Sequence, residues 1–258
     1  MKKNLILIFF ISMLFVHASG HSNSDTINVP GKWSLGINLS PDYCFRTLIN
    51  TSGSPYADLV IDSRNGYEQF KIGFSAGVVA NYRISEKAFF EFGVSYSDKG
   101  YSSKKMELTF GDAIDPRYGF TYPTSSTSNL SGLLAVKFYY NHIYLDVPVR
   151  VLFAFGQKKT RLVTGIGVTS GFLLKSTQNI VYDSGDGSNS VSTYDQYETF
   201  NNFNLFSEVS IGVERQFGKK VTLRVQPVFK YGILKIIDAH VSAHLWSGGL
   251  NFGCYYHL

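Results

Sequence analysis

The sequence predicts an all-β fold: an eight-stranded antiparallel up-and-down transmembrane β-barrel with long extracellular loops and short periplasmic turns. First, residues 203–217 and 221–234 alternate apolar with polar side chains around the tight turn 218–220, which is the pattern of a β-hairpin. Second, both runs exceed the about five or six residues of an ordinary strand and suit a tilted strand that crosses a bilayer. Third, tight turns and long polar loops alternate along the chain, as they do in outer-membrane barrels.

Composition agrees with this fold. The chain contains 24 Gly, and its aromatic content of 16% comes mostly from 17 Tyr and 21 Phe. The formal net charge of +5 is modest, and no patch interleaves basic with aromatic residues. We therefore expect no nucleic-acid partner.

The N-terminus has the organisation of a signal peptide. Lys2 and Lys3 precede an apolar run from Leu5 to Val16, and small residues follow at 18–20. The alternative, a single membrane anchor, needs about 20 apolar residues, more than this run supplies. We expect a signal peptide over residues 1–20, a short lead over 21–31 and one barrel domain over 32–258.

The eight expected strands follow from period-2 alternation. Their ranges are 32–40, 68–83, 88–102, 136–155, 160–175, 203–217, 221–234 and 245–257. Tight turns are expected at 84–87, 156–159 and 218–220, and longer loops at 41–66, 103–134, 176–201 and 236–244. The segment 106–110 is expected to extend a hairpin beyond the membrane. An even number of strands can close without a free edge.

Two prolines and two cysteines test this arrangement. Pro148 and Pro227 lie inside expected strands, where each removes a ladder hydrogen bond, so we expect a bulge or a local widening at both. Cys44 and Cys254 fall near opposite rims of neighbouring first and last strands. A disulfide needs Cα atoms within about 7 Å, and cysteines near opposite rims are farther apart than that. We therefore expect two free thiols.

Polar residues on the inward positions form the candidate site, an interior charge network. Counting from the tight turns places Glu91 opposite Arg150, Glu214 opposite Arg224 and Glu208 opposite Lys230. Two interpretations remain open: a charge-paired interior that fills the barrel, or a gated conduit or proton path. The network comprises Glu91, Asp146, Arg150, Glu208, Glu214, Arg224 and Lys230, with Arg83 and Arg161 also inward.

Other chemistry has weaker support. Asp183 and Asp186 lack the alternating spacing of a calcium loop, and His240 with His244 lacks a third metal ligand. His142 has no matching nucleophile and orienting group in the sequence. We expect no metal, no cofactor and no enzymatic activity.

Six segments spread along the chain carry a family resemblance: 73–77 with 82–85, 96–101, Tyr144 to Pro148, Gly212 to Arg215, Arg224 to Pro227 and 251–258. Together they resemble the PorT-like family of bacterial outer-membrane β-barrel proteins. The final residue departs from the aromatic ending common in such barrels, because it is Leu258. The resemblance implies an outer-membrane location in a Gram-negative envelope and suggests a link to protein secretion or gliding.

We therefore expect a non-enzymatic integral outer-membrane protein whose extracellular loops serve envelope structure or partner binding. The alternatives are a small outer-membrane channel and a lipid-modifying barrel enzyme. Expected partners are outer-membrane lipid and lipopolysaccharide, the barrel-assembly machinery during insertion, and proteins of an envelope or secretion complex.

Overall fold

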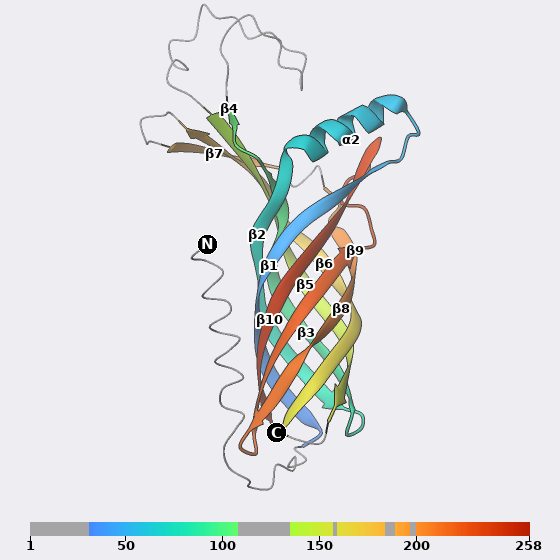
Figure 1. Cartoon of the computed structure of the whole chain (residues 1–258), viewed down its shortest axis with the longest axis vertical. Coiled ribbons are helices and arrows are strands. Elements are labelled where there is room, and N and C mark those ends of the chain that lie inside the picture. The colour runs from blue at the N-terminus through green and yellow to red at the C-terminus, as the bar shows by residue number, and fades with distance from the viewer. Residues whose placement is uncertain (1–30, 108–134, 157–158, 184–188, 197–199) are drawn as a thin grey trace, which may run out of the picture.

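Eight long strands close into a barrel in the computed structural model, which describes residues 31–107, 135–156, 159–183, 189–196 and 200–258. Each strand pairs antiparallel with the next along the barrel wall, and β1 pairs with β10 to close the ring. The predicted fold is confirmed (Figure 1). The barrel strands are β1 (Trp33–Asn50), β2 (Glu68–Arg83), β3 (Ala88–Ser103), β5 (Ala135–Phe155), β6 (Thr160–Asp183), β8 (Phe203–Phe217), β9 (Val221–Gly232) and β10 (Val241–His257).

The two ends of the barrel differ as predicted. The tight turns between β2 and β3, β5 and β6, and β8 and β9 gather at one end, with the C-terminus (Figure 1). The other end carries the helix α2 (Pro55–Tyr67) and the short strands β4 (Met106–Glu107) and β7 (Asn189–Asp195). We call these the turn end and the loop end. In outer-membrane barrels the short turns are periplasmic and the long loops are extracellular.

An apolar belt surrounds the barrel between two aromatic girdles. Near the turn end, the rings of Trp33 and Tyr82 lie 4.9 Å apart, and near the loop end those of Tyr43 and Phe70 lie 5.4 Å apart. Ten residues of a tilted strand between them rise about 25 Å, the usual height of a lipid-facing band. Outward side chains of the belt, such as Ile37 and Val209, are more than half exposed, as expected for a surface that lipid covers.

The predicted end of the first strand, at residue 40, was wrong, as was the loop 41–66. β1 continues through Pro41 to Asn50, and the helix α2 fills most of the remainder. The Ser54 side chain caps α2 by accepting a hydrogen bond from Tyr56 N, and Pro55 occupies the first turn, both common helix-start features. The helix has little amphipathic character, so apolar periodicity could not reveal it. No helix in the described part of the chain is long and apolar enough to cross a membrane.

The predicted loop 176–201 is partly a second projecting hairpin. β6 continues to Asp183 and pairs with β7 from Thr177↔Asp195 to Asp183↔Asn189. The predicted extension at 106–110 is confirmed for Met106 and Glu107, which pair with β5, whereas residues 108–110 lie outside the described range. Together β4, β5, β6 and β7 extend the wall beyond the barrel. β10 likewise starts earlier than predicted, at Val241 rather than 245.

The strand prolines interrupt the ladder locally, and the pairing shows no bulge at either predicted position. Near Pro148 the β3–β5 pairing skips two positions and resumes in the same register, and near Pro227 the β8–β9 pairing does the same. Pro41 produces an equal gap between β1 and β10. The reason is the missing N–H, which removes the bond toward one neighbour while the other neighbour stays paired. The register shifts lie elsewhere, between Phe70 and Phe74 and between Ile143 and Tyr144.

The cysteines behave as predicted. Both are free; Cys44 is buried and Cys254 is exposed. Cys44 pairs with Ser247 and Cys254 pairs with Ile37, so the two thiols lie at different heights of the same strand pair. The expected signal peptide over 1–20 and nearly all of the lead over 21–31 lie outside the described residues.

Candidate functional site: the barrel interior

The centre of the interior is a continuous network of buried ion pairs. Glu91 on β3 bridges two arginines: it forms an ion pair with Arg150 on β5, and it accepts a hydrogen bond from Arg224 on β9 at 2.9 Å. Arg150 also donates to Glu208 at 2.7 Å, and Thr169 donates to the other oxygen of Glu208 at 3.0 Å. All four charged side chains are at most 5% exposed. The network therefore crosses the lumen from one wall to the other.

Glu214 extends the network toward the turn end. Arg224 donates two hydrogen bonds to one oxygen of Glu214, at 3.0 and 3.1 Å, and Arg161 forms an ion pair with the other. Arg224 also donates to Tyr255 at 3.1 Å and lies over its ring. The strand register confirms the predicted opposition of Glu214 with Arg224 and of Glu91 with Arg150.

Asp146 has a different partner from the rest of the predicted set. It forms an ion pair with Lys99 and accepts a hydrogen bond from Ser97 at 2.8 Å. Lys99 is missing from the predicted set, although it continues the inward alternation of Glu91 and Ser97 along β3. That alternation was the signal that could have found it.

Two more interior pairs lie closer to the loop end. Lys71 donates to Asp98 at 2.6 Å, and Arg46 binds Glu68 through two nitrogens, one of them at 2.9 Å. Arg46 is missing from the predicted set because the predicted first strand ended at residue 40, which left Arg46 in a loop. The β2–β3 register shift between Phe70 and Phe74 lies beside Lys71 and upsets simple counting from the turn. Arg83 is partly exposed at the turn end.

Lys230 is in register with Glu208, as predicted. Among the hydrogen bonds of the described residues, however, none joins the Lys230 ammonium group to the Glu208 carboxylate. Lys230 lines a polar cavity of about 20 Å³, enough for about one water molecule. Asp42, fixed by Ser40 at 2.6 Å and Ser75 at 2.9 Å, supplies a further anion at this height. A water here would give the lysine an acceptor. The cavity is lined by Ser40, Ser75, Ser95, Arg150, Glu208 and Asn251, among others.

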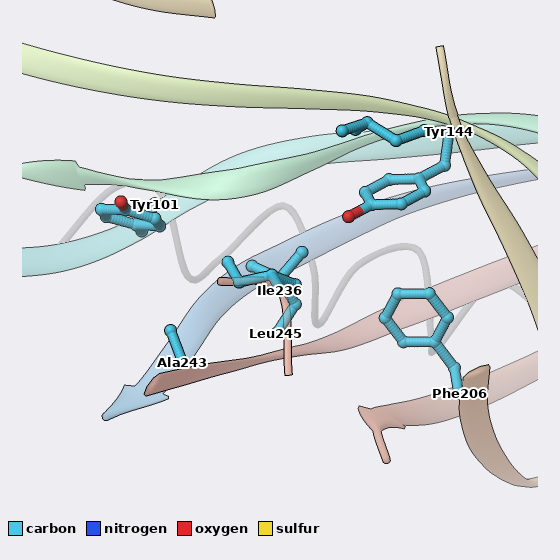
Figure 2. Close-up of a cluster of buried hydrophobic side chains, with 7 residues drawn as sticks. Tyr101, Tyr144, Phe206, Ile236, Ala243 and Leu245 are labelled. Atoms are coloured by element: carbon cyan, nitrogen blue, oxygen red, sulfur yellow. The ribbon is translucent and has the colours of Figure 1, made fainter. Parts of the chain in front are cut away.

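An apolar layer closes the interior toward the loop end. Figure 2 shows side chains from several strands directed toward one another across the lumen, with Ile236 among them. Ile236 comes from the connection between β9 and β10 and is 1% exposed; its N–H donates to Ala243 O at 2.8 Å, and its carbonyl accepts from Asn201 N at 2.8 Å. This connection therefore folds inward as a lid. The layer comprises Tyr101, Tyr144, Leu173, Phe206, Ile236, Ala243 and Leu245.

A smaller apolar layer lies at the turn end. Phe89, Leu152, Ala154 and Val163 are buried together, and the Arg161 guanidinium lies 5.3 Å from the centre of the Phe89 ring. The central charged pairs are thus enclosed between two apolar layers, whereas Arg46 lies level with the loop-end layer, 3.7 Å from the centre of the Tyr101 ring.

The interior charges named above balance. Because an eight-stranded barrel has an interior just wide enough for its own side chains, we expect this arrangement to act as a plug. The cations, counted with partly exposed Arg161 and Lys230, are Arg46, Lys71, Lys99, Arg150, Arg161, Arg224 and Lys230, and the anions, counted with partly exposed Asp98, are Asp42, Glu68, Glu91, Asp98, Asp146, Glu208 and Glu214.

Other candidate chemistry stays separate from this network. His142 Nδ1 lies 2.9 Å from Ser176 Oγ, but both residues are at most 1% exposed. His244 bonds to the Gly232 carbonyl, and Asp183 forms an ion pair with Lys105. No group of three His, Cys, Asp or Glu within the described residues is arranged to hold a metal.

A second surface of interest lies outside the barrel. On α2, Tyr56, Leu59 and Val60 are 79%, 65% and 42% exposed, while Ala57 is buried toward the barrel. These three positions share one helix face. The loop end thus presents an apolar helix face beyond the lipid-facing belt.

A closed ring of eight strands with an apolar exterior, aromatic girdles and a charge-paired interior defines an integral outer-membrane barrel. The family comparison agrees, because the model of the outer membrane protein beta-barrel domain matches residues 23–238. The chain belongs to this family. β10, which closes the ring, lies beyond the matched range. No curated relative matches the sequence.

Solved structures to which the chain is similar include Neisserial surface protein A, at 16% identity and a TM-score of 0.42, covering 90% of this chain and 100% of that one. The attachment invasion locus protein Ail of Yersinia pestis has 10% identity and a TM-score of 0.32, covering 87% and 99%. The outer membrane protease OmpT of Escherichia coli has 7% identity and a TM-score of 0.39, covering 89% and 98%. Similarity at this level says nothing of activity.

Proposed function

We propose that the protein is a non-enzymatic outer-membrane barrel that binds an envelope partner through its loop end. The observation that carries the proposal is the contrast between a filled interior and the exposed apolar face of α2, made of Tyr56, Leu59 and Val60. An apolar patch outside the membrane is typical of a protein–protein contact. The hydrogen-bonded pair His142 and Ser176 is buried and out of reach of a substrate, which supports a non-enzymatic role.

The resemblance to PorT-like proteins suggests the class of partner: a component of a protein secretion or gliding apparatus. Lipopolysaccharide would surround the loop end, and the barrel-assembly machinery would act during insertion. The hairpin of β6 and β7, with Val191 61% and Tyr194 49% exposed, adds contact surface on the same side of the membrane.

A pull-down tests the α2 contact. The full chain, tagged between residues 183 and 189, is cross-linked in the envelope and purified beside the variant Tyr56→Ser/Leu59→Ser/Val60→Ser. We expect a reproducible envelope partner with the wild type and at least a fivefold lower yield with the variant. The control Asp62→Ser/Asn65→Ser, on exposed polar positions of the same helix, should retain the partner.

Equal recovery from both variants would refute the role of the α2 face. The secretion or gliding link needs its own test, which is a deletion strain. Normal export and normal surface motility of that strain would remove the PorT-like part of the proposal and leave the barrel assignment intact.

A further inference from the structure

The turn end is strongly basic. Seven basic side chains lie at or beside the tight turns and the start of β1, and Glu86 is the one exposed acidic side chain among the described residues there. Glu214 is also near this end, but it is buried and bound by Arg161 and Arg224. The basic residues are Lys32, Arg83, Lys87, Lys159, Arg215, Lys219 and Lys220.

The loop end does not share this charge. Within its described residues basic and acidic side chains are equal in number, and several are paired, such as Lys105 with Asp183 and Lys235 with Asp238. The basic residues are Arg64, Lys104, Lys105, Lys137, Lys175 and Lys235, and the acidic ones are Asp58, Asp62, Glu107, Asp183, Asp195 and Asp238. The positive charge is therefore specific to the turn end.

Arg215 shows what the turn end faces. It lies on the outward side of β8 between Val213 and Phe217, both of which belong to the lipid-facing row. Its guanidinium lies 5.6 Å from the centre of the Phe217 ring. A long basic side chain at such a position extends along the wall and places its charge at the level of the lipid headgroups.

Lys220 meets the same boundary from the turn between β8 and β9. Its ammonium group donates a hydrogen bond to the Tyr256 hydroxyl at 3.0 Å and lies 5.4 Å from that ring. Since Phe217 pairs with Val221, and Val221 pairs with Tyr256, Arg215, Lys220 and the two aromatic rings occupy one patch of three neighbouring strands. The hydrogen bond to Tyr256 raises the pKa of Lys220, so the side chain stays charged at neutral pH.

We propose that this patch, centred on Arg215, Lys219 and Lys220, binds the phosphate groups of anionic phospholipids in the periplasmic leaflet. Phosphate carries the complementary charge, and guanidinium with ammonium groups is a common way to hold it. A soluble acidic protein is the less suitable ligand, because Arg215 projects from the lipid-facing wall. The bound headgroups would fix the depth and tilt of the barrel in the membrane.

Native mass spectrometry of the folded full chain, released from vesicles with equal phosphatidylglycerol and phosphatidylcholine, tests the proposal. We expect the wild type to retain phosphatidylglycerol at least threefold over phosphatidylcholine. Arg215→Gln/Lys219→Gln/Lys220→Gln should lose most of this preference. The charge-matched control Lys104→Gln/Lys105→Gln/Lys235→Gln, at the loop end, should keep it.

Folding of every variant is verified first by the shift between boiled and unboiled gel bands. High salt should weaken the preference of the wild type, because it screens exposed charges. An unchanged preference in the turn-end variant, or an equal loss in the loop-end control, would overturn the proposal and leave a soluble acidic protein as the ligand class to pursue.

Discussion

Glu91 and Glu214 each hold two arginines, and this sharing makes the interior network interdependent. Arg224 binds both carboxylates, and Arg150 links Glu91 to Glu208. Removing one member leaves its partners charged and buried without full pairing, which costs more than the net worth of the pair. The network therefore fixes the relative positions of β3, β5, β8 and β9.

The pair Glu214 and Arg224 gives the first prediction. Glu214→Gln and Arg224→Gln should each lower the free energy of unfolding by about 3–5 kcal/mol, because each strands a buried charge. The double variant should lose less than the sum of the two. Urea unfolding in lipid vesicles measures all three, and additive losses would show that the two side chains act independently.

The exposed pair Lys235 and Asp238 is the control for this cycle. Their side chains are 43% and 76% exposed, so Lys235→Gln should change stability by no more than about 0.5 kcal/mol.

At the scale of one element, β8 combines the two faces that a barrel strand needs. Its outward row includes Phe203, Val209 and Phe217, and its inward row includes Glu208 and Glu214. A shift of one residue would turn the glutamates toward lipid and the valine inward. The strand therefore has a single favourable register, in which the apolar row faces lipid and the glutamates face the interior ion pairs.

Val209 gives the second prediction because it lies midway between Phe203 and Phe217, at the centre of the belt. Val209→Arg should destabilise the folded barrel by about 2–4 kcal/mol, the usual cost of a lipid-facing arginine at the bilayer midplane. Urea unfolding in vesicles measures this cost, and the folded band on an unboiled gel should weaken.

Val191→Arg on β7 is the matched control. Val191 is 61% exposed, compared with 51% for Val209, but it lies on the hairpin beyond the belt, so stability should stay within about 0.5 kcal/mol. Equal effects of the two changes would contradict the placement of the belt.

For the whole molecule, the interior layers decide whether the barrel conducts. The loop-end layer with the Ile236 lid, the central ion pairs and the turn-end layer around Phe89 follow one another along the axis. The polar cavity beside Lys230 holds about 20 Å³, far less than a water column requires. The filled interior favours a plug over a channel.

Planar bilayer recording gives the third prediction. The wild type should show little or no steady conductance, with rare small openings at most. Glu91→Gln/Glu208→Gln should raise the frequency of openings, because Arg150 then loses both of its carboxylates. Asp62→Asn on α2, outside the lumen, should leave the recordings unchanged, and stable ohmic conductance of the wild type would contradict the plug.

Local patterns in the sequence predict the barrel, the faces of its strands and the opposition of Glu91 with Arg150 and Glu214 with Arg224. These follow from the period of two along a strand and from counting outward from a tight turn, which are both local. The early end predicted for β1 shows where local reasoning stopped. Proline is typical of loops, and Pro41 interrupts the pairing of β1 with β10. The strand nevertheless continues, because β1 stays paired with β2 at this position.

The partner of Asp146, the inward lid at Ile236 and the projecting hairpin of β6 and β7 are visible only in the folded chain. Asp146 meets Lys99 diagonally between β5 and β3 rather than its register partner Ser95, and the lid packs against side chains from other strands across the lumen. β6 and β7 pair beyond the barrel rim, in a segment whose polar composition is typical of a loop. The weakly amphipathic helix α2 is held by the Ser54 cap and by contacts with β1, β2 and β10. Closure of the ring places β10 beside β1 and the helix, and closure is a property of the whole sheet.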